Sequence, residues 1–188
     1  MKLSEHKDLK KEILALPPKE KDKLLLRLVA KDKVLTEHLH FLLLEDESNL
    51  RDRVAAIKEE ILQQTANLKK AKNTNAKEVL ANLRKQAKLV NHNFRVTKAG
   101  FEDVELRVFL QNHTLTEFRS GIFSSFKNYE QLFATYYVKY TLVTLRKFYK
   151  LHEDLQYDLK EDFNLLLSKA AEGILAATAK DLALPKEI

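Results

Sequence analysis

Apolar residues recur every three or four positions along this chain, which is the spacing of an amphipathic α-helix. The clearest run follows "EDES" and places Leu50, Val54, Ile57, Ile61 and Leu68 on one face. Three shorter runs precede it, and Pro17-Pro18 separates the first two because proline suits only the first turn of a helix. We expect the apolar stripes of the second and third runs to be buried, namely Leu24, Leu25, Leu28, Val29, Leu35, Leu39, Leu42 and Leu43.

The helical spacing resumes beyond the polar stretch "KNTN". Asn75 followed by Glu78 resembles a capping box, in which the two side chains satisfy the first free N–H groups of a helix. Gly100 suits the left-handed position after the end of that helix, and Gly121 is expected to end the next helix in the same way. The stretch "FEDVE" places three acids in the first turn of this next helix, where the helix dipole favours them.

Residues 129–151 are apolar on two faces, and a helix of this kind is usually central in a bundle. The last helix carries apolar residues from Leu155 to Ala177 and ends before Pro185. We count about eight helices and no convincing strand. The chain is therefore predicted to be all-α and a single domain over residues 1–188, with a candidate sub-domain junction near 72–76. A helical bundle and a short irregular solenoid of antiparallel helical hairpins both fit this pattern.

The composition supports long helices and excludes some chemistry. Only three glycines and three prolines occur in 188 residues, whereas strands need frequent turns. The absence of cysteine excludes disulfides, thiolate metal sites and a cysteine nucleophile, and it fits a reducing cytoplasm. No signal peptide is visible, and the longest apolar runs are far shorter than the roughly 20 residues of a membrane span. We expect a cytoplasmic protein that does not enter the membrane.

The segment 69–98 is strongly basic. It holds nine basic residues and one acid, so its charge of +8 exceeds the +6 of the whole chain. At 100° per residue, most of the cations of its second helix fall within about 60° of a common line. The first three lysines join them if the asparagine-rich turn folds the two helices together. The candidate residues for binding an anionic partner are Lys69, Lys70, Lys72, Lys77, Arg84, Lys88, Arg95 and Lys98.

Three interpretations of this basic face stay open. A solvated face that keeps the chain soluble ranks first, followed by a docking site for an acidic protein and then by nucleic-acid binding. Nucleic acid ranks last because the segment lacks exposed aromatic residues that could stack on bases and has only two arginines. The sequence "HEDLQYDLKED" is rich in acids, and its row Asp154, Asp158 and Asp162 has three interpretations. An exposed face or a salt-bridge partner for the basic helix ranks first, and a site for a hard cation ranks below, because like charges at i,i+4 repel weakly. The salt-bridge partnership could lie within one chain or across a dimer.

The tyrosines of residues 129–151 also have two interpretations. Core packing ranks first, because most aromatic residues at helical spacing are buried. Any of them that proves to be exposed is a candidate for a partner interface or a homodimer interface, where tyrosine is favoured. The interface candidates are Tyr136, Tyr137, Tyr140 and Tyr149.

Three motifs resemble those of a family of small, uncharacterised, all-helical bacterial proteins. They are "LPPKEKDKLLLRLVAKDK" at residues 16–33, "VELRVFL" at 104–110 and "LHEDLQYD" at 151–158. Some members of that family carry an automatic label as deoxyuridine triphosphate hydrolases. All-helical enzymes of that kind use an ExxE pair followed by an ExxD pair to hold Mg²⁺. Glu102 and Glu105 form an ExxE, but no ExxD follows them.

Other constellations for catalysis are absent from the sequence. His113 and Glu117 could share a metal ion at i,i+4 spacing, but a third ligand is missing. No glycine-rich phosphate loop or nucleophile elbow occurs. We therefore predict no catalytic residue, metal or cofactor. The leading function is protein–protein interaction or scaffolding with an unknown protein partner. Sequence-independent nucleic-acid binding is the alternative, and a metal-dependent nucleotide hydrolase is the third hypothesis.

Overall fold

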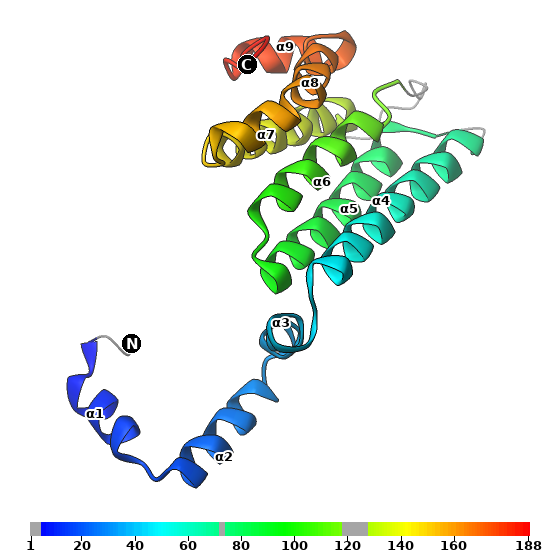
Figure 1. Ribbon diagram of the computed structural model, residues 1–188. Helices are drawn as coiled ribbons and strands as arrows, with labels where there is room; N and C mark the ends of the chain where they lie inside the picture. The colour runs from blue at the N-terminus through cyan, green and yellow to red at the C-terminus, as the bar shows by residue number, and fades with distance from the viewer. Residues whose placement is uncertain (1–4, 72–73, 118–127) are drawn as a thin grey trace. The chain divides into compact units, whose positions relative to one another are not determined.

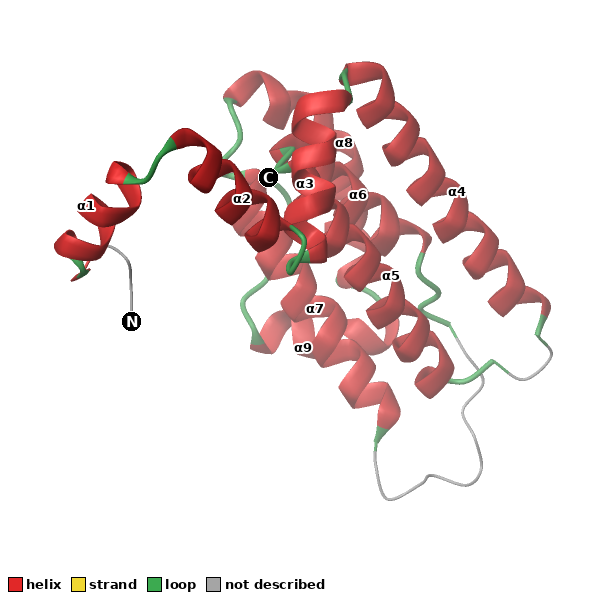
Figure 2. Cartoon of the chain, turned by 90° about the horizontal axis from the view of Figure 1, so that it is seen from below, coloured by secondary structure: helices red, strands yellow, loops and turns green. Residues whose placement is uncertain are grey.

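The computed structural model describes residues 5–71, 74–117 and 128–188. Of the described residues, 82% are helical, and they form nine α-helices, one short 3-10 helix and no strand, which confirms the all-α prediction (Figure 2). The chain divides into two compact units, Met1–Glu45 and Asp46–Ile188. The boundary therefore precedes the segment 72–76, where a junction was predicted. Whether the chain folds as a single domain stays a prediction.

The first unit contains α1 (Lys7–Ala15), α2 (Pro18–Val29) and α3 (Lys33–Leu44). Pro18 occupies the first turn of α2, as predicted. Asp32 caps α3 by accepting hydrogen bonds of 3.0 and 3.1 Å from the N–H groups of Val34 and Leu35. These local signals place the helix starts correctly.

The predicted burial of the leucines in this unit is wrong. None of the three helices contains a buried residue. Leu24, Val29 and Leu39 are half-buried, whereas the exposed leucines of the two predicted stripes are Leu25, Leu28, Leu35, Leu42 and Leu43. Three helices of 9, 12 and 12 residues are too short to enclose a core of their own. The apolar stripe of each helix exists, but the unit has too little chain to cover it.

The second unit is a helical bundle of α4 (Glu47–Lys70), α5 (Ala76–Thr97), α6 (Gly100–His113), α7 (Tyr129–Phe148), α8 (Glu153–Ala170), a 3-10 turn η2 (Gly173–Leu175) and α9 (Ala176–Asp181). Helices α4, α5 and α6 lie side by side in Figure 1. Helix α6 packs against α4, α5, α7 and α8, so it is central to the packing of the bundle. Helix α7, which the sequence predicted to be central, is likewise surrounded by neighbours, because it packs against α5, α6, η2 and α9.

The hydrophobic core of the bundle is drawn from α4 to η2. Val54, Ile57 and Ile61 of α4 are buried, as their spacing predicted. The largest fully buried side chains include Phe133 and Phe163. At the chain end, the N–H of Ile188 donates a hydrogen bond of 2.9 Å to Asn164 Oδ1, which holds the C-terminus against α8.

Local signals at the helix ends are confirmed in part. Asn75 and Glu78 form the predicted capping box of α5. The left-handed position after α5 is taken by Lys98, with φ of 58°, and not by Gly100, which begins α6. Helix α6 ends at His113, and Gly121 lies outside the described residues. The last predicted helix ends at Ala170, because Gly173 with φ of 54° separates α8 from α9.

Among the described residues, no helix combines the length and apolar character needed to cross a membrane.

Candidate interaction surface on helices α5 and α7

The basic stripe of α5 lies beside aromatic residues of α7. Lys77 Nζ lies 5.7 Å from the centre of the Tyr129 ring, and the Arg84 guanidinium carbon lies 5.2 Å from the centre of the Tyr136 ring. Both distances are within the range of a cation–π contact. The basic residues and the tyrosines, which the sequence analysis treated as separate candidates, therefore meet along one line.

Helices α5 and α7 run parallel along this line. The contact of Lys77 with Tyr129 is near the start of both helices, and Lys147 Nζ of α7 lies 4.1 Å from the centre of the Phe94 ring, near the end of both. At 1.5 Å per residue, the 17 residues from Lys77 to Phe94 span about 25 Å. The line is thus long enough to contact a helix of a partner over several turns.

The cations that point outwards along this line define what we call the α5–α7 surface. They are Lys77, Arg84, Lys88, Arg95 and Lys98 from α5 and its cap, with Lys139 and Arg146 from α7, and all seven are exposed. No ion pair to an acid is found for any of the seven within the described residues. Around the axis of α7, Lys139 and Arg146 lie within about 100° of the tyrosines that face α5. These two cations therefore border the same surface.

Acids are scarce on these two helices. Glu78 and Glu130 are the acids of α5 and α7, and each lies in the first turn of its helix. The dipole of a helix favours a negative charge at this end. The rest of the surface is therefore positive without interruption, which attracts anionic groups and slows association with other cations.

The four tyrosines proposed as interface residues differ in exposure. Tyr137 is fully buried and Tyr140 is 8% exposed, so both are core residues and not interface residues. Tyr136 is half-buried beneath Arg84. Tyr149 is 58% exposed and stays an interface candidate. Burial raises the pKa of Tyr136, Tyr137 and Tyr140 above its usual value, so these hydroxyl groups stay protonated at neutral pH.

A buried ion network holds the α5–α7 surface in place. Asp103 of α6 is 2% exposed and accepts hydrogen bonds of 2.8 Å from Arg107 Nε and 2.7 Å from Lys147 Nζ. Arg107 also donates a hydrogen bond to Asn91 of α5 and lies 5.0 Å from the centre of the Tyr140 ring of α7. One carboxylate of the central helix thus ties α5 and α7 together, because its two cationic partners reach both neighbours.

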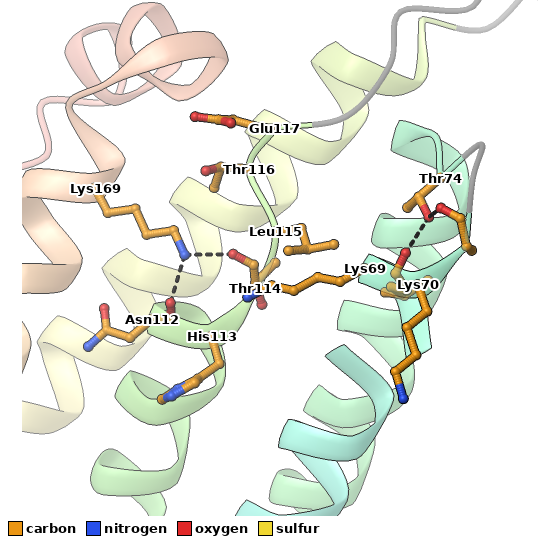
Figure 3. Close-up of a pocket in the computed structure, with 12 residues that line it drawn as sticks. Lys69, Lys70, Thr74, Asn112, His113, Thr114, Leu115, Thr116, Glu117 and Lys169 are labelled. Carbon is orange, nitrogen blue, oxygen red and sulfur yellow. Dashed lines mark hydrogen bonds between the residues drawn. The ribbon is translucent and has the colours of Figure 1, made fainter. Parts of the chain in front are cut away.

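Lys69 and Lys70 do not belong to the α5–α7 surface. They line a separate pocket of about 760 Å³ together with the end of α6 and Lys169 of α8 (Figure 3). None of the seven cations of the α5–α7 surface lines this pocket. Lys72 lies outside the described residues.

The amine of Lys169 is occupied within the pocket. It donates hydrogen bonds of 2.7 Å to the carbonyl oxygen of Asn112 and 2.6 Å to that of Thr114, which Figure 3 shows as dashed lines, and one of 3.3 Å to that of Gln111. Carbonyl groups at the end of a helix have no partner within the helix, and this lysine satisfies those of α6. Burial lowers the pKa of Lys169 to about 8, and the charge of Lys69 acts in the same direction. The contacts make Lys169 a structural residue.

The residues of the hydrolase hypothesis do not form a metal site among the described residues, where no group of three or more histidine or acidic side chains could hold a metal ion. Glu105 accepts a hydrogen bond of 2.7 Å from Lys58 Nζ. Glu102 lines a groove of about 370 Å³ with Glu105 and Lys58. His113 Nδ1 is 2.8 Å from the carbonyl oxygen of Phe109, within hydrogen-bond distance.

The acidic row of α8 is exposed, which was one of its three interpretations. Asp154, Asp158 and Asp162 are all exposed. Helix α8 packs against α6, and no ion pair joins its acids to the α5–α7 surface in the part of the chain that the structure describes. A salt-bridge partnership between the acidic row and the basic helix within one chain is therefore not present. His152 caps α8 by accepting a hydrogen bond from the N–H of Asp154.

Sequence reasoning missed the contribution of α7 to the basic surface. Lys139 and Arg146 lie in the segment that was analysed only for its aromatic residues. Their seven-residue spacing places them on one side of the helix, and this was the available signal. That α5 and α7 are neighbours could not be read from the sequence, because 31 residues separate Thr97 from Tyr129 along the chain.

Comparison of this chain with protein-family models, with curated proteins and with solved structures gave no match in any of the three. The resemblance to the bacterial helical family stays a prediction.

Proposed function

We infer that this chain is a non-enzymatic, cytoplasmic protein–protein interaction module that binds an acidic surface of its partner on the α5–α7 surface. The observation that carries this proposal is the row of seven exposed cations, none of which has an ion pair within the described residues. The helices already hold the backbones of these residues in place, so only their side chains lose freedom when a partner binds, and their charges favour fast and specific association. The cytoplasmic location rests on the cysteine-free sequence alone.

Two features favour a protein over a nucleic acid as the partner. The rings of Tyr129 and Tyr136 are half-buried and already face the cations of Lys77 and Arg84, so they are poorly placed to stack on bases. Exposed apolar side chains also lie on α7 beside the cations, since Leu132 and Val143 are each 42% exposed. Apolar contacts contribute to a protein interface but not to binding a phosphate backbone.

The test is a capture experiment from nuclease-treated native lysate, with the full chain as bait. Lys88→Glu/Arg95→Glu reverses two charges of the surface that make no contact with the core. Lys180→Glu/Lys186→Glu is the matched control, because both lysines are exposed and lie outside the surface. We expect acidic proteins that bind the wild type and the control but are lost, by at least about tenfold, from the surface variant.

Other results would point elsewhere. Equal capture by all three baits would refute the role of the α5–α7 surface. If capture depends on intact nucleic acid, and if a generic duplex binds with an affinity that falls steeply with salt, the surface binds nucleic acid instead. A flat titration with the duplex at low salt would remove that alternative.

A further inference from the structure

Helix α8 presents a second charged surface with the opposite sign. Asp154, Asp158 and Glu161 are exposed and lie within about 60° of one another around the helix. Tyr157, which is 80% exposed, and Leu165, which is 59% exposed, lie on the same side. We call these five residues the acidic α8 face. It joins acids to an exposed aromatic residue, and exposed tyrosines are frequent anchors of protein interfaces.

The spacing of the acids matches the spacing of the cations on α7. Lys139 and Arg146 are seven residues apart, and so are Asp154 and Glu161. Seven residues make about two helical turns, so each pair lies on one side of its helix at about 10.5 Å separation. Two helices that lie side by side can therefore form both ion pairs at once.

The apolar residues of the two surfaces are also complementary in position. Leu132 and Val143 lie beside the cations of α7, and Tyr157 and Leu165 lie beside the acids of α8. Contact between the two surfaces would remove all four side chains from water. In an interface that combines apolar contacts with ion pairs, the buried apolar side chains contribute affinity and the charges contribute specificity.

Resting on the proposed function of the α5–α7 surface, we propose that its partner is a second copy of this chain, which docks through its acidic α8 face. Within one copy these faces carry opposite charges without an ion pair between them among the described residues. A second copy supplies the acids that the cations lack and the cations that the acids lack. If both faces of one copy meet both faces of the other, the assembly closes as a two-fold dimer, and if each pair of copies forms only one contact, assembly continues beyond a dimer or closes into a ring.

The assembly is tested by light scattering on purified full chain over a range of protein concentrations at low salt. The mass of the wild type should rise with concentration from the 21.9 kDa of one chain to at least twice that value. Lys139→Glu/Arg146→Glu reverses the cations, and Asp154→Asn/Glu161→Gln neutralises the acids. Each variant alone should stay monomeric, since each lacks one half of the contact. All four positions are exposed, so circular dichroism should show the wild-type helix content.

Mixing and combining the substitutions gives the decisive results. An equimolar mixture of the two variants should stop at a 1:1 dimer, because one intact contact forms and no further one can. The charge-swapped chain, Lys139→Glu/Arg146→Glu/Asp154→Lys/Glu161→Lys, should assemble again. A wild type that stays monomeric at every concentration, or an assembly that both variants retain, would overturn the proposal.

The same variants separate this inference from the proposed function. If the wild type is monomeric but Lys139→Glu/Arg146→Glu loses acidic proteins from lysate, the surface functions with another acidic partner and only the second copy is wrong. If the wild type stays monomeric and Lys139→Glu/Arg146→Glu captures the same proteins as the wild type, both proposals fail. An assembly that is indifferent to all these charges would instead direct attention to the exposed leucines of the first unit.

Discussion

Neutralising the carboxylate beneath the α5–α7 surface should destabilise the bundle strongly. The substitution Asp103→Asn keeps the size of the side chain and removes its charge. The side chain of Arg107 is 4% exposed and would then be a buried cation that faces a neutral amide in place of a carboxylate. Removing one partner of a buried ion pair costs about 3–5 kcal/mol, because the remaining charge has lost both water and its counterion.

The second cation in this network contributes less to that loss. The side chain of Lys147 is 29% exposed and can turn towards solvent after the substitution, so its part of the cost is screened. We therefore expect about 3–4 kcal/mol in total, a large fraction of the roughly 5–15 kcal/mol that stabilises a domain. Urea unfolding followed by circular dichroism measures this free energy directly.

The same helix provides a matched control. Glu105→Gln also changes an acid to its amide on α6, but its ion pair with Lys58 is about a quarter to a third exposed on both sides. Such a pair is worth about 0–1 kcal/mol. If Asp103→Asn costs no more than Glu105→Gln, the buried network does not hold α5 and α7 to α6, and the reasoning is refuted. Adding Arg107→Met to Asp103→Asn should recover part of the loss, because the uncompensated cation is gone.

Three further outcomes follow from the structure. Gln86 is 1% exposed, and neither polar atom of its amide has a hydrogen-bond partner within the described residues. Replacing it by methionine, Gln86→Met, should therefore raise the free energy of unfolding in urea by about 1–2 kcal/mol. The same substitution at an exposed glutamine, Gln63→Met, should change this free energy little. The pKa of Lys169 in the folded chain is about 8, below its usual value of 10.5. Between these two pH values the unfolded chain binds more protons than the folded chain, so the folded state is favoured as pH rises. The stability of the wild type should therefore increase relative to Lys169→Met across this pH range. Solvent reaches this half-buried amine, so we expect a gain of about 1–2 kcal/mol in urea unfolding, and a falling difference would contradict the assignment. Finally, the cluster of buried core residues runs from Val54 to Leu175 among the described residues and so lies within the second unit. The chain 46–188 should therefore melt within about 3 °C of the full chain in calorimetry, and a much lower melting temperature would show that the first unit stabilises the bundle.

Local signals in the sequence predicted the helices well where a few neighbouring residues decide the outcome. The capping box of Asn75 and Glu78 and the start of α2 at Pro18 are confirmed, and the apolar stripe of α4 is buried at Val54, Ile57 and Ile61. The prediction at Gly100 failed because Lys98 adopts the left-handed conformation two residues earlier. A helix end is a small local energy difference, and neighbouring residues compete for it.

The identity of the central helix could not be predicted from apolar pattern alone. The buried side of α6 carries Asp103, Arg107 and Gln111 at four-residue spacing, which in sequence is typical of an exposed face. These residues are buried because partners on other helices satisfy them, as when Gln111 donates a hydrogen bond to Thr141 of α7. The sequence therefore indicated a central position for 129–151 and not for α6, because those partners are visible only in the folded chain.

Residues within a few turns of each other fix which segments become helices, where most of these helices begin, and that one face of α5 is basic, so these properties can be predicted from the sequence. Which of those faces meet depends on the packing of the helices. It placed α7 parallel to α5, added Lys139 and Arg146 to the basic surface, buried Tyr137 and Tyr140, and left the leucines of the first unit uncovered. Burial and charge pairing depend on residues far apart in the chain, and the packing of the central helix, with its buried carboxylate, determines which of them become neighbours.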